Sequence, residues 1–505
     1  MAVSIPTDNY KTQVVELSLS ASEELKEMVE GEDPLWIYDD VKQIQVLNEV
    51  EYKRRFAPLD SSLEEIIKVI TNGGSIIDEL PNLNVDEIQS ETKFETEASR
   101  AMGIVNMNAH RIANIFMDVE QWSLLFSNMV SKATNLGRLT QGQGSIDGVV
   151  QVMNATYEFS SPLLKGRDFK FARYCRQRDS STWLISDVSL EKVFPNPIIK
   201  CQRRPSGCLI QALPDGFSKV TFVEHNVVSK DIVHNMFEKL VDSSLVFTSN
   251  RWLTTLQRFY DRNTIFERDI GNEWKGVLKL GERMLRSYHS NVNSSLDIRW
   301  RPMPLSGGED ILVRTNFNED DPGIPKVVTL NIATSVWLPI HQDHLFNFFC
   351  DGRNRSKWDL LSRDRVTREA MVLPTTKGVD GCVSIVLVEP RDSNEVPNTY
   401  IQESFRDSNC SYVVYAPIDI SAMSYILQGE EADFVAILPS GFSILPGSTM
   451  HVDKEGGKGS ILTISFEIID ESLSSPDVLP PSSVSTAYNI IKATIVSIKH
   501  ALTAS

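Results

Sequence analysis

The stretch from Lys165 to Leu190 constrains the fold more than any other, because it predicts two β-strands that carry an arginine toward a core. Period-two alternation places Phe169, Phe171 and Arg173 on one face of the first strand. A polar Asp-Ser-Ser turn at residues 179–181 leads into the return strand. An unpaired buried charge costs several kcal/mol. An arginine on this face therefore needs a partner or a ligand, unless it lies at a strand end and reaches water.

The rest of the first half of the chain extends this antiparallel pattern. The predicted elements are strands at 148–159, 208–213 and 219–228 and helices at 108–118, 121–130 and 233–259. A Pro-Asp-Gly turn at residues 214–216 joins the last two strands. The helix from Val233 to Phe259 has a broad apolar stripe, so we expect it to close the unit. A sheet followed by a long helix predicts the α+β class.

The N-terminal segment, residues 1–97, combines an amphipathic helix with an acidic stretch. Apolar residues recur at helical spacing from Val14 to Met28, and we expect this helix to pack on the first domain. Residues 58–96 are acidic and contain turn signals. They predict a partly mobile surface segment with one short helix at 63–70.

The net charge of −17 is unevenly distributed along the chain. Residues 1–97 carry 8 Lys/Arg and 22 Asp/Glu, whereas the remainder carries 42 and 45. Phosphate binding requires a clustered basic surface, and only the short runs 53–55 and 200–204 come near one. The sequence contains neither a W-F-x-N-x-R string nor a sustained heptad stripe. We therefore expect no direct nucleic-acid binding by this chain.

Motifs of catalysis and metal binding are incomplete. His341 and His344 have zinc-like spacing, but no further ligand accompanies them. The glycine-rich string at 456–460 runs into a predicted strand rather than a helix, so it predicts a hairpin turn and not a phosphate loop. Neither G-x-S-x-G nor H-E-x-x-H occurs. We expect no enzyme activity, no catalytic residues and no metal.

Cysteine spacing and hydropathy predict a soluble intracellular protein. The six cysteines contain no C-x-x-C pair and are expected to be reduced core thiols. No apolar run approaches the ~20 residues that span a bilayer, so no transmembrane segment is expected. The N-terminus has neither the basic start nor the apolar run of a signal peptide.

Several sequence blocks, in the same order along almost the whole chain, resemble one family. The strand pair with R-D-F-x-x-x-R at 167–173 is similar to the steroidogenic acute regulatory protein-related lipid-transfer (START) domain. Four further blocks resemble the plant class IV homeodomain–leucine zipper transcription factors. They are E-A-S-R at 97–100, M-D-V-E-Q-W-S at 117–123, R-R-P-S-G-C-L-I-Q at 203–211 and V-H-N-M at 233–236. The resemblance implies a helix-grip fold, a lipid or other amphipathic ligand, protein partners or family dimerisation, and a nuclear location.

The second half of the chain is predicted to repeat the first. Phe-Met-Asp at 116–118, followed by Trp122, recurs as Phe-Cys-Asp at 349–351, followed by Trp358. Pro-Ser-Gly also recurs, and an apolar closing helix is expected again near the C-terminus. We expect two tandem helix-grip domains, with a START lipid-binding core at 98–265 and a START-adjacent, START-like domain at 273–505.

The resemblance also implies a ligand cavity in the first domain, with Arg173 as the main candidate for contacting a lipid head group. START-like pockets often set such an arginine against an acid on a neighbouring strand. At the position where relatives tend to carry Glu, this chain has Thr156, and Glu158 follows on the same strand face. Whether Arg173 meets a ligand or pairs with Glu158 or another acid stays open. The other candidate ligand residues are Phe169, Phe171, Glu158, Trp183, Glu224, His225 and Phe247.

Three functions therefore stay open at the level of sequence. The chain could be the lipid-binding regulatory region of a homeodomain–leucine zipper type transcriptional regulator, here without its DNA-binding domain. It could be a free-standing lipid-binding or lipid-transfer protein. It could also be a protein-interaction module whose cavities are filled by its own side chains.

Overall fold

The chain divides into two compact units, which are described separately. The computed structural model describes residues 8–40, 42–56, 94–142, 145–190, 201–229, 233–267, 271–294, 300–303, 310–317, 323, 326–376, 381–391, 397–447, 459–470 and 479–503. The first unit comprises residues 1–126, 130–157 and 167–260, and the second comprises 127–129, 158–166 and 261–505. The expected helix at 63–70 lies outside the described residues, as does most of the glycine-rich string at 456–460.

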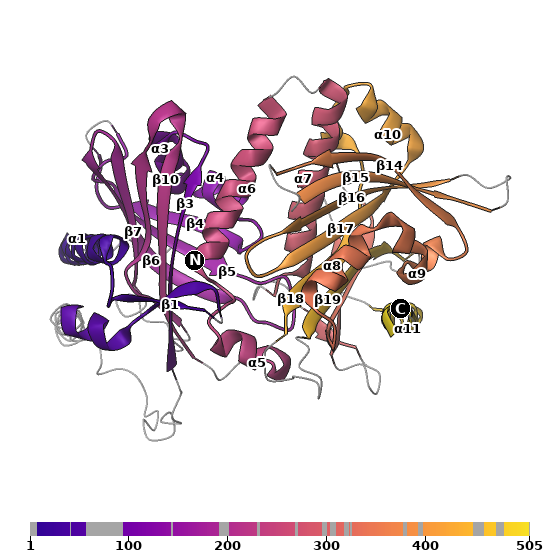
Figure 1. Ribbon diagram of the computed structural model, residues 1–505, viewed down its shortest axis with the longest axis horizontal. Helices are drawn as coiled ribbons and strands as arrows, with labels where there is room; N and C mark the ends of the chain where they lie inside the picture. Colours follow the sequence, from indigo (N-terminus) through magenta and orange to yellow (C-terminus); the bar gives the residue numbers. More distant parts are fainter. Residues whose placement is uncertain are drawn as a thin grey trace. The chain divides into compact units, whose positions relative to one another are not determined.

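The first unit is built on one antiparallel sheet (Figure 1). Its strands are β1 (Trp36–Asp39), β2 (Ile44–Leu47), β3 (Phe94–Val105), β4 (Val130–Arg138), β5 (Val150–Tyr157), β6 (Arg167–Asp179), β7 (Thr182–Ser189), β8 (Cys201–Arg203), β9 (Ser206–Ala212) and β10 (Ser218–Ser229). The order across the sheet is β1-β2-β3-β10-β9-β7-β6-β5-β4, with β8 beside β10. The predicted strands correspond to β5, β6, β7, β9 and β10, whereas the other five were not predicted.

Helices cover both faces of this sheet. They are α1 (Asp8–Glu30), α3 (Ala109–Met117), α4 (Val119–Leu125), α5 (Asn235–Asp242), α6 (Ser249–Glu267) and the short η3 (Pro214–Gly216). The helix α1 contacts β6, β7, β9 and β10 of this sheet. It buries Leu25 against Leu184 and Val223 on what we call the outer face of the sheet. The inner face carries Phe171 and Arg173 and lies toward α3, α4 and α6 (Figure 1).

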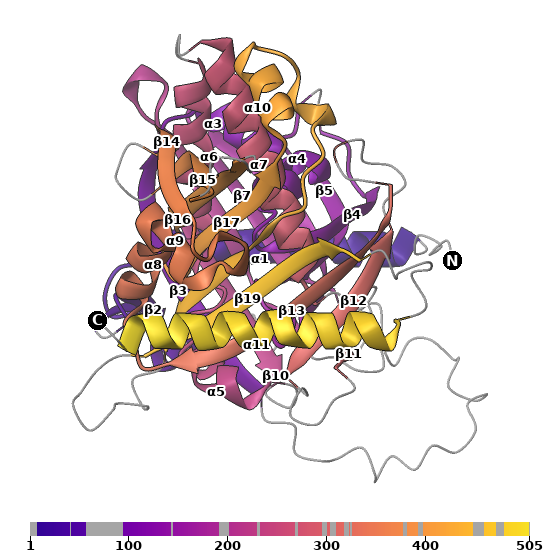
Figure 2. The same cartoon turned by 90° about the vertical axis from the view of Figure 1, so that its right-hand side faces the viewer.

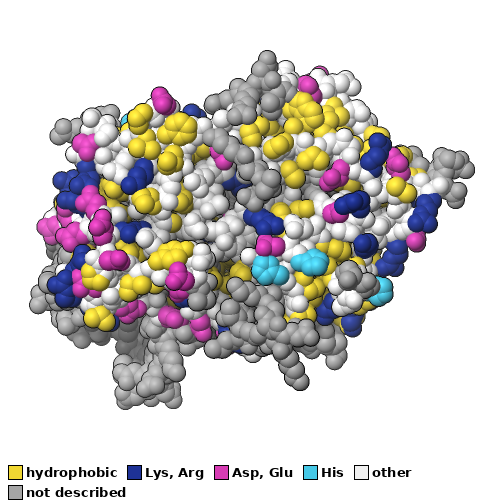
Figure 3. All heavy atoms as spheres, viewed as in Figure 1, with side chains coloured by type: hydrophobic (Ala, Val, Ile, Leu, Met, Phe, Trp, Pro, Cys, Tyr) yellow, Lys and Arg dark blue, Asp and Glu magenta, His cyan; other side chains and the backbone are white. Residues whose placement is uncertain are grey.

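Ion pairs fasten the exposed side of α1 to the β6–β7 hairpin. Arg176 pairs with Glu23, and Arg178 pairs with Glu30. Basic and acidic side chains lie close together at the left edge of Figure 3, where Figure 1 draws α1. Such exposed pairs contribute little stability, so the apolar side of α1 supplies most of the attachment.

The prediction of one long helix from Val233 to Phe259 was wrong, because α5 and α6 are separate helices. The chain turns away after α5, where Ser243 Oγ donates to Leu240 O (2.6 Å). Ser244 then adopts a left-handed φ of 59°, which no α-helix contains. The apolar stripe continues across the break, and for this reason periodicity alone does not reveal it.

The second unit repeats the same topology. Its strands are β11 (Arg301–Pro302), β12 (Ile311–Phe317), β13 (Val328–Leu338), β14 (Val366–Pro374), β15 (Gly381–Glu389), β16 (Asn398–Arg406), β17 (Ser411–Ile418), β18 (Ser440–Pro446) and β19 (Ser460–Ile469). Its helices are α7 (Asn272–Val292), α8 (Gln342–Cys350), α9 (Arg355–Trp358), α10 (Ile420–Leu427), α11 (Pro481–Thr503) and the short η4 (Gly352–Asn354), η5 (Leu360–Ser362) and η6 (Ala432–Phe434). The order β11-β12-β13-β19-β18-β17-β16-β15-β14 matches that of the first sheet, which confirms the predicted tandem α+β helix-grip arrangement.

The repeated aspartate has the same structural role in both units. Asp118 follows the nine-residue α3, and Asp351 follows the nine-residue α8. Each carboxylate then caps the next helix: Asp118 accepts from two backbone N–H groups at its start, and Asp351 accepts from one. The tryptophans that follow, Trp122 and Trp358, are both buried. A cap between two short helices therefore explains the repeated motif.

Long helices lie on both faces of the second sheet. On one face, α11 lies across the strands and contributes Ala487 and Ile491 to a core cluster that includes Ile444 (Figure 2). On the other face, Tyr288 of α7 forms a hydrogen bond with Ser443 (3.0 Å), the neighbour of Ile444 on β18. Across the described parts of both units, no helix combines the length and the hydropathy needed to cross a membrane.

Candidate ligand site

The inner face of the first sheet holds a buried ion pair between Arg173 and Asp187. Arg173 Nε and Nη2 donate to the two oxygens of Asp187 (2.8 and 2.9 Å). Its Nη1 donates to Phe116 O (2.8 Å). Burial alone would lower the pKa of Arg173, but the Asp187 carboxylate raises it above its ordinary value. All three nitrogens of the guanidinium thus have protein partners.

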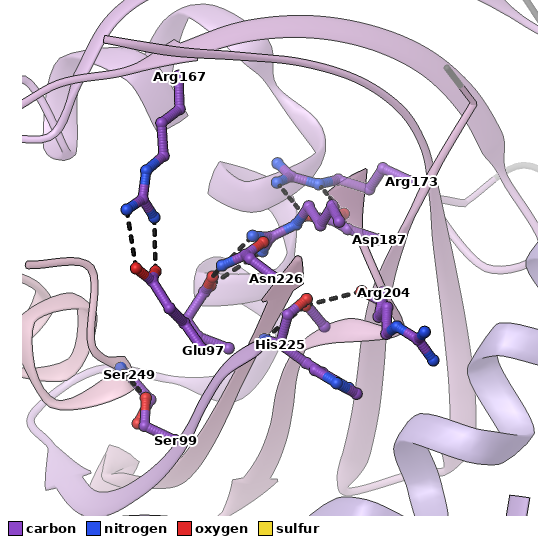
Figure 4. Close-up of polar contacts among 12 residues, drawn as sticks. Glu97, Ser99, Arg167, Arg173, Asp187, Arg204, His225, Asn226 and Ser249 are labelled. Atoms are coloured by element: carbon purple, nitrogen blue, oxygen red, sulfur yellow. Dashed lines mark hydrogen bonds and ion pairs between the residues drawn. The ribbon is translucent and has the colours of Figure 1, made fainter. Parts of the chain in front are cut away.

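A second buried pair extends this network across the sheet (Figure 4). Arg203 donates from both terminal nitrogens to the carboxylate of Glu224 (2.7 and 2.9 Å). Its Nε lies 3.4 Å from Asp187 Oδ2, and Asn226 also donates to Glu224 (3.3 Å). The charges of two arginines and two carboxylates therefore cancel on this face of the sheet, where any one of these charges buried without a partner would lower stability.

Aromatic side chains enclose the network. The guanidinium of Arg173 lies 4.4 Å from the ring centroid of Trp122, and the ring of Trp252 stacks on Trp122 with centroids 6.0 Å apart. The ring of Tyr157 meets Trp252 edge-on at 5.2 Å. Arg173 and these three aromatic residues line a cavity of about 10 Å³, which has room for roughly one water molecule.

Most of the predicted site residues lie in or beside this network. Arg173 and Glu224 line the cavity. Phe171 contacts both Arg173 and Arg203, and Phe169 packs against Tyr157 with ring centroids 4.9 Å apart. Phe247 lies in the connection between α5 and α6 and meets Tyr157 at 6.3 Å.

Two predicted residues lie elsewhere in the first unit. Trp183 contacts His110 of α3 (5.3 Å between rings) and does not line the cavity. His225 faces the outer side of the sheet, where its ring meets Tyr52 edge-on at 4.9 Å. Adjacent residues on a strand point to opposite faces, so Glu224 and His225 could not both line one cavity.

Glu158, one of the two open alternatives as the partner of Arg173, does not have that role. Its carboxylate accepts from the backbone N–H of Ser294, and both residues belong to the second unit. Thr156 donates instead to Asp168 (2.6 Å). The acid that pairs with Arg173 is Asp187, directly opposite it on β7.

The sequence alone did not identify Asp187 because the register of the hairpin depends on a bulge. The pairing of β6 with β7 shifts by one residue between Gln177 and Asp179. Without that shift, Arg173 would lie opposite Val188, and the Asp187 carboxylate would no longer lie directly across from it. A one-residue bulge is a property of the folded ladder and leaves little trace in hydrophobic periodicity.

Polar contacts fix the N-terminal end of α6 at the rim of the site (Figure 4). The backbone N–H of Ser249 donates to Ser99 Oγ of β3 (2.9 Å). Arg167 forms two hydrogen bonds with Glu97 (2.6 and 2.8 Å), and its guanidinium lies 4.7 Å from the ring centroid of Phe247. The α5–α6 connection thus rests on the first residues of β3 and β6.

Metal-binding groups do not come together in the described part of the chain, where no three His, Cys, Asp or Glu side chains form a suitable cluster. His341 instead caps α8, since its Nδ1 accepts from the backbone N–H of Asp343 (3.3 Å). The described contacts thus give this imidazole a structural role.

Comparison with protein families matches two models, the START domain at residues 78–262 and the PDF2-like C-terminal domain at residues 272–504. Among curated proteins, the chain is 34% identical to homeobox-leucine zipper protein HDG3 of Arabidopsis thaliana, over 98% of this chain and 66% of that protein. It is 32% identical to ANTHOCYANINLESS 2 of the same plant and 32% identical to ROC4 of Oryza sativa subsp. japonica. These alignments cover 98% and 97% of this chain and 60% and 62% of those proteins. The chain thus spans about three fifths of the length of the relatives it matches.

Solved structures give weaker likenesses. Human StAR-related lipid transfer protein 5 is 15% identical, with a TM-score of 0.26, over 40% of this chain and 99% of that one. The di-domain ARO/CYC BexL is 8% identical, with a TM-score of 0.22, over 80% and 95%.

Proposed function

The chain belongs to the plant class IV homeodomain–leucine zipper family through its START and PDF2-like C-terminal domains, and we propose that it is the ligand-responsive regulatory region of such a transcriptional regulator. The proposed ligand is a lipid or another amphipathic molecule, bound between the first sheet and α6. We propose domain limits of 98–265 and 273–505, with the N-terminal segment attached to the first. By analogy with the family we also propose a nuclear location and no enzyme activity.

The observation that supports this site most strongly is the charge network beneath α6. A core built only for stability gains little from buried ion pairs, because the cost of removing the charges from water can exceed their attraction. Arg173, Asp187, Arg203 and Glu224 are each at most 4% exposed, and all four line the cavity. Such a fixed polar centre in an apolar surrounding is typical of ligand pockets.

If a lipid binds at this site, the described conformation is a closed one. Pockets for drug-sized ligands typically measure about 300–1,000 Å³, far more than the cavity of about 10 Å³ found here. Ligand entry therefore requires side chains, and with them α6, to move outward. The contacts of Ser249 and Phe247 hold the N-terminal end of α6 in place. The rest of α6 can therefore swing outward about the break between α5 and α6, which makes this break the natural hinge.

Native mass spectrometry of the full chain after incubation with a lipid extract tests the proposal. We expect one amphipathic molecule per chain, accompanied by a rise in melting temperature, because a ligand that binds only the folded state stabilises it. Recovery of the bare chain alone, under conditions where a known START protein retains its lipid, would contradict lipid binding.

One observation favours a second candidate function. A cavity of about 10 Å³ is also what an interaction module with a filled interior would have. In that case the first unit regulates by binding another protein, and lipids neither bind nor stabilise it. The same mass spectra and thermal melts separate the two candidates.

A further inference from the structure

Three buried hydrogen-bond donors at the cavity have no acceptor among the described residues. They are Trp122 Nε1, Trp252 Nε1 and the hydroxyl of Tyr157. Their side chains are 1%, 2% and 1% exposed, and all three residues line the cavity. Arg203 Nε is a fourth such donor, since it makes only the 3.4 Å ion-pair contact with Asp187. Buried donors are rarely left without partners, so this cluster indicates something that accepts from them.

The acceptors around the same cavity are already engaged. Both oxygens of Asp187 accept from Arg173, and both oxygens of Glu224 accept from Arg203. Burial raises the pKa of Tyr157, so its hydroxyl keeps its proton and can still donate. The cavity therefore offers mainly donors, and its charges already sum to zero.

We propose that this cavity selects an uncharged oxygen acceptor, the ketone, ester or ether oxygen of an otherwise apolar ligand. The inference rests on the proposed function and narrows its ligand class. It also changes the role of Arg173, which holds the network in place, because all three of its guanidinium nitrogens already donate within the protein.

Charge balance and donor balance exclude the competing head groups. A carboxylate or phosphate would add a negative charge to a buried network that has no positive charge left over. An alcohol brings a hydrogen that needs an acceptor. Tyr157 could accept it, but the two indole N–H groups can only donate. A carbonyl oxygen accepts through two lone pairs and brings no donor, so it fits this set best.

The test uses four probes of equal chain length, namely dodecan-2-one, dodecan-2-ol, dodecanoate and dodecane. Isothermal titration of the full chain should show the ketone binding more tightly than the alcohol, and dodecanoate no more tightly than dodecane. Tyr157→Phe should weaken ketone binding roughly tenfold, the usual effect of one lost hydrogen bond, and leave dodecane binding unchanged. Trp122→Phe and Trp252→Phe should act in the same direction.

Matched controls come from buried side chains that do not line the cavity. Tyr174→Phe removes a hydroxyl on the outer face, and Trp36→Phe removes an indole whose Nε1 donates to Met28 O (2.8 Å). Both variants should bind the ketone as the unmodified chain does. Dodecanoate binding as tightly as the ketone would overturn the inference, and so would Tyr157→Phe weakening dodecane and ketone equally.

Failure of this inference is distinguishable from failure of the proposed function. If the extract supplies a bound lipid that has only an anionic or hydroxyl head group, the head-group inference is wrong and the function stands. If neither the extract nor any probe binds, both are wrong.

Discussion

At the scale of single residues, the role of Arg173 changes once its partners are known. Its three hydrogen bonds to Asp187 and Phe116 account for all of its guanidinium nitrogens. Arg173→Leu should leave the Asp187 carboxylate buried without its two hydrogen bonds from Arg173. We expect this change to destabilise the first unit by about 3–5 kcal/mol. Chemical denaturation would measure this loss of unfolding free energy.

Two further variants make this prediction specific. The double variant Arg173→Leu/Asp187→Leu should recover most of the loss, because no uncompensated carboxylate is left. Arg176→Ala removes an exposed partner of Glu23 and should cost less than about 1 kcal/mol. Arg173 would instead be a ligand residue if Arg173→Leu kept full stability and lost only lipid binding.

His225 should make the first unit sensitive to acid. Burial, with a smaller effect of the nearby Arg204, lowers its pKa from 6.5 to about 3. The unfolded chain takes up a proton below about pH 6.5 while the folded chain does not. This contribution to stability is therefore complete above pH 6.5 and is lost progressively as the pH falls toward 3.

Urea unfolding at pH 7 and pH 5 would measure that loss. At 1.36 kcal/mol per pH unit, His225 should account for about 2 kcal/mol of the difference. His225→Gln should remove this share, whereas His344→Gln, at an exposed position, should not. An identical pH difference in the unmodified chain and His225→Gln would show that this imidazole does not contribute.

At the scale of secondary-structure elements, the sequence predicted those with uninterrupted periodicity. The strands β5, β6, β7, β9 and β10 and the long helices α1 and α11 all have it. By contrast, β3 was missed because Glu97 and Arg100 interrupt its alternation. Both find partners only in the folded unit, Glu97 with Arg167 and Arg100 with Gln45.

The candidate site was predictable in part for the same reason. Alternation placed Phe169, Phe171 and Arg173 correctly, but the partner Asp187 depended on a bulge. The two tryptophans of the cavity come from α4 and α6, which are separated in the sequence by strands β4 to β10, and they stack only in the folded unit. Interactions within one strand could be read from the sequence, whereas interactions between elements required the structure.

At the scale of the whole molecule, one topology carries two different interiors. In the first unit the two arginines of the inner-face network come from β6 and β8, and they pair with carboxylates on β7 and β10. In the second, Arg355 comes from α9, donates to Asp359 and lies 4.0 Å from the ring centroid of Tyr400. A repeated fold therefore does not imply a repeated site, and the ligand proposal applies to the first unit alone.

The charge of the whole chain supports the last prediction, that this chain alone does not bind DNA sequence-specifically at physiological salt. Its net charge is −17, and a protein must neutralise several phosphates with Lys and Arg to hold a duplex. A gel shift on a homeodomain-type site should show no retardation, while full-length ANTHOCYANINLESS 2, a homeobox-leucine zipper relative, serves as the positive control.

A shift by this chain that survives competitor DNA and 150 mM salt would overturn the prediction. A shift lost in salt would be the non-specific attraction that falls steeply with ionic strength.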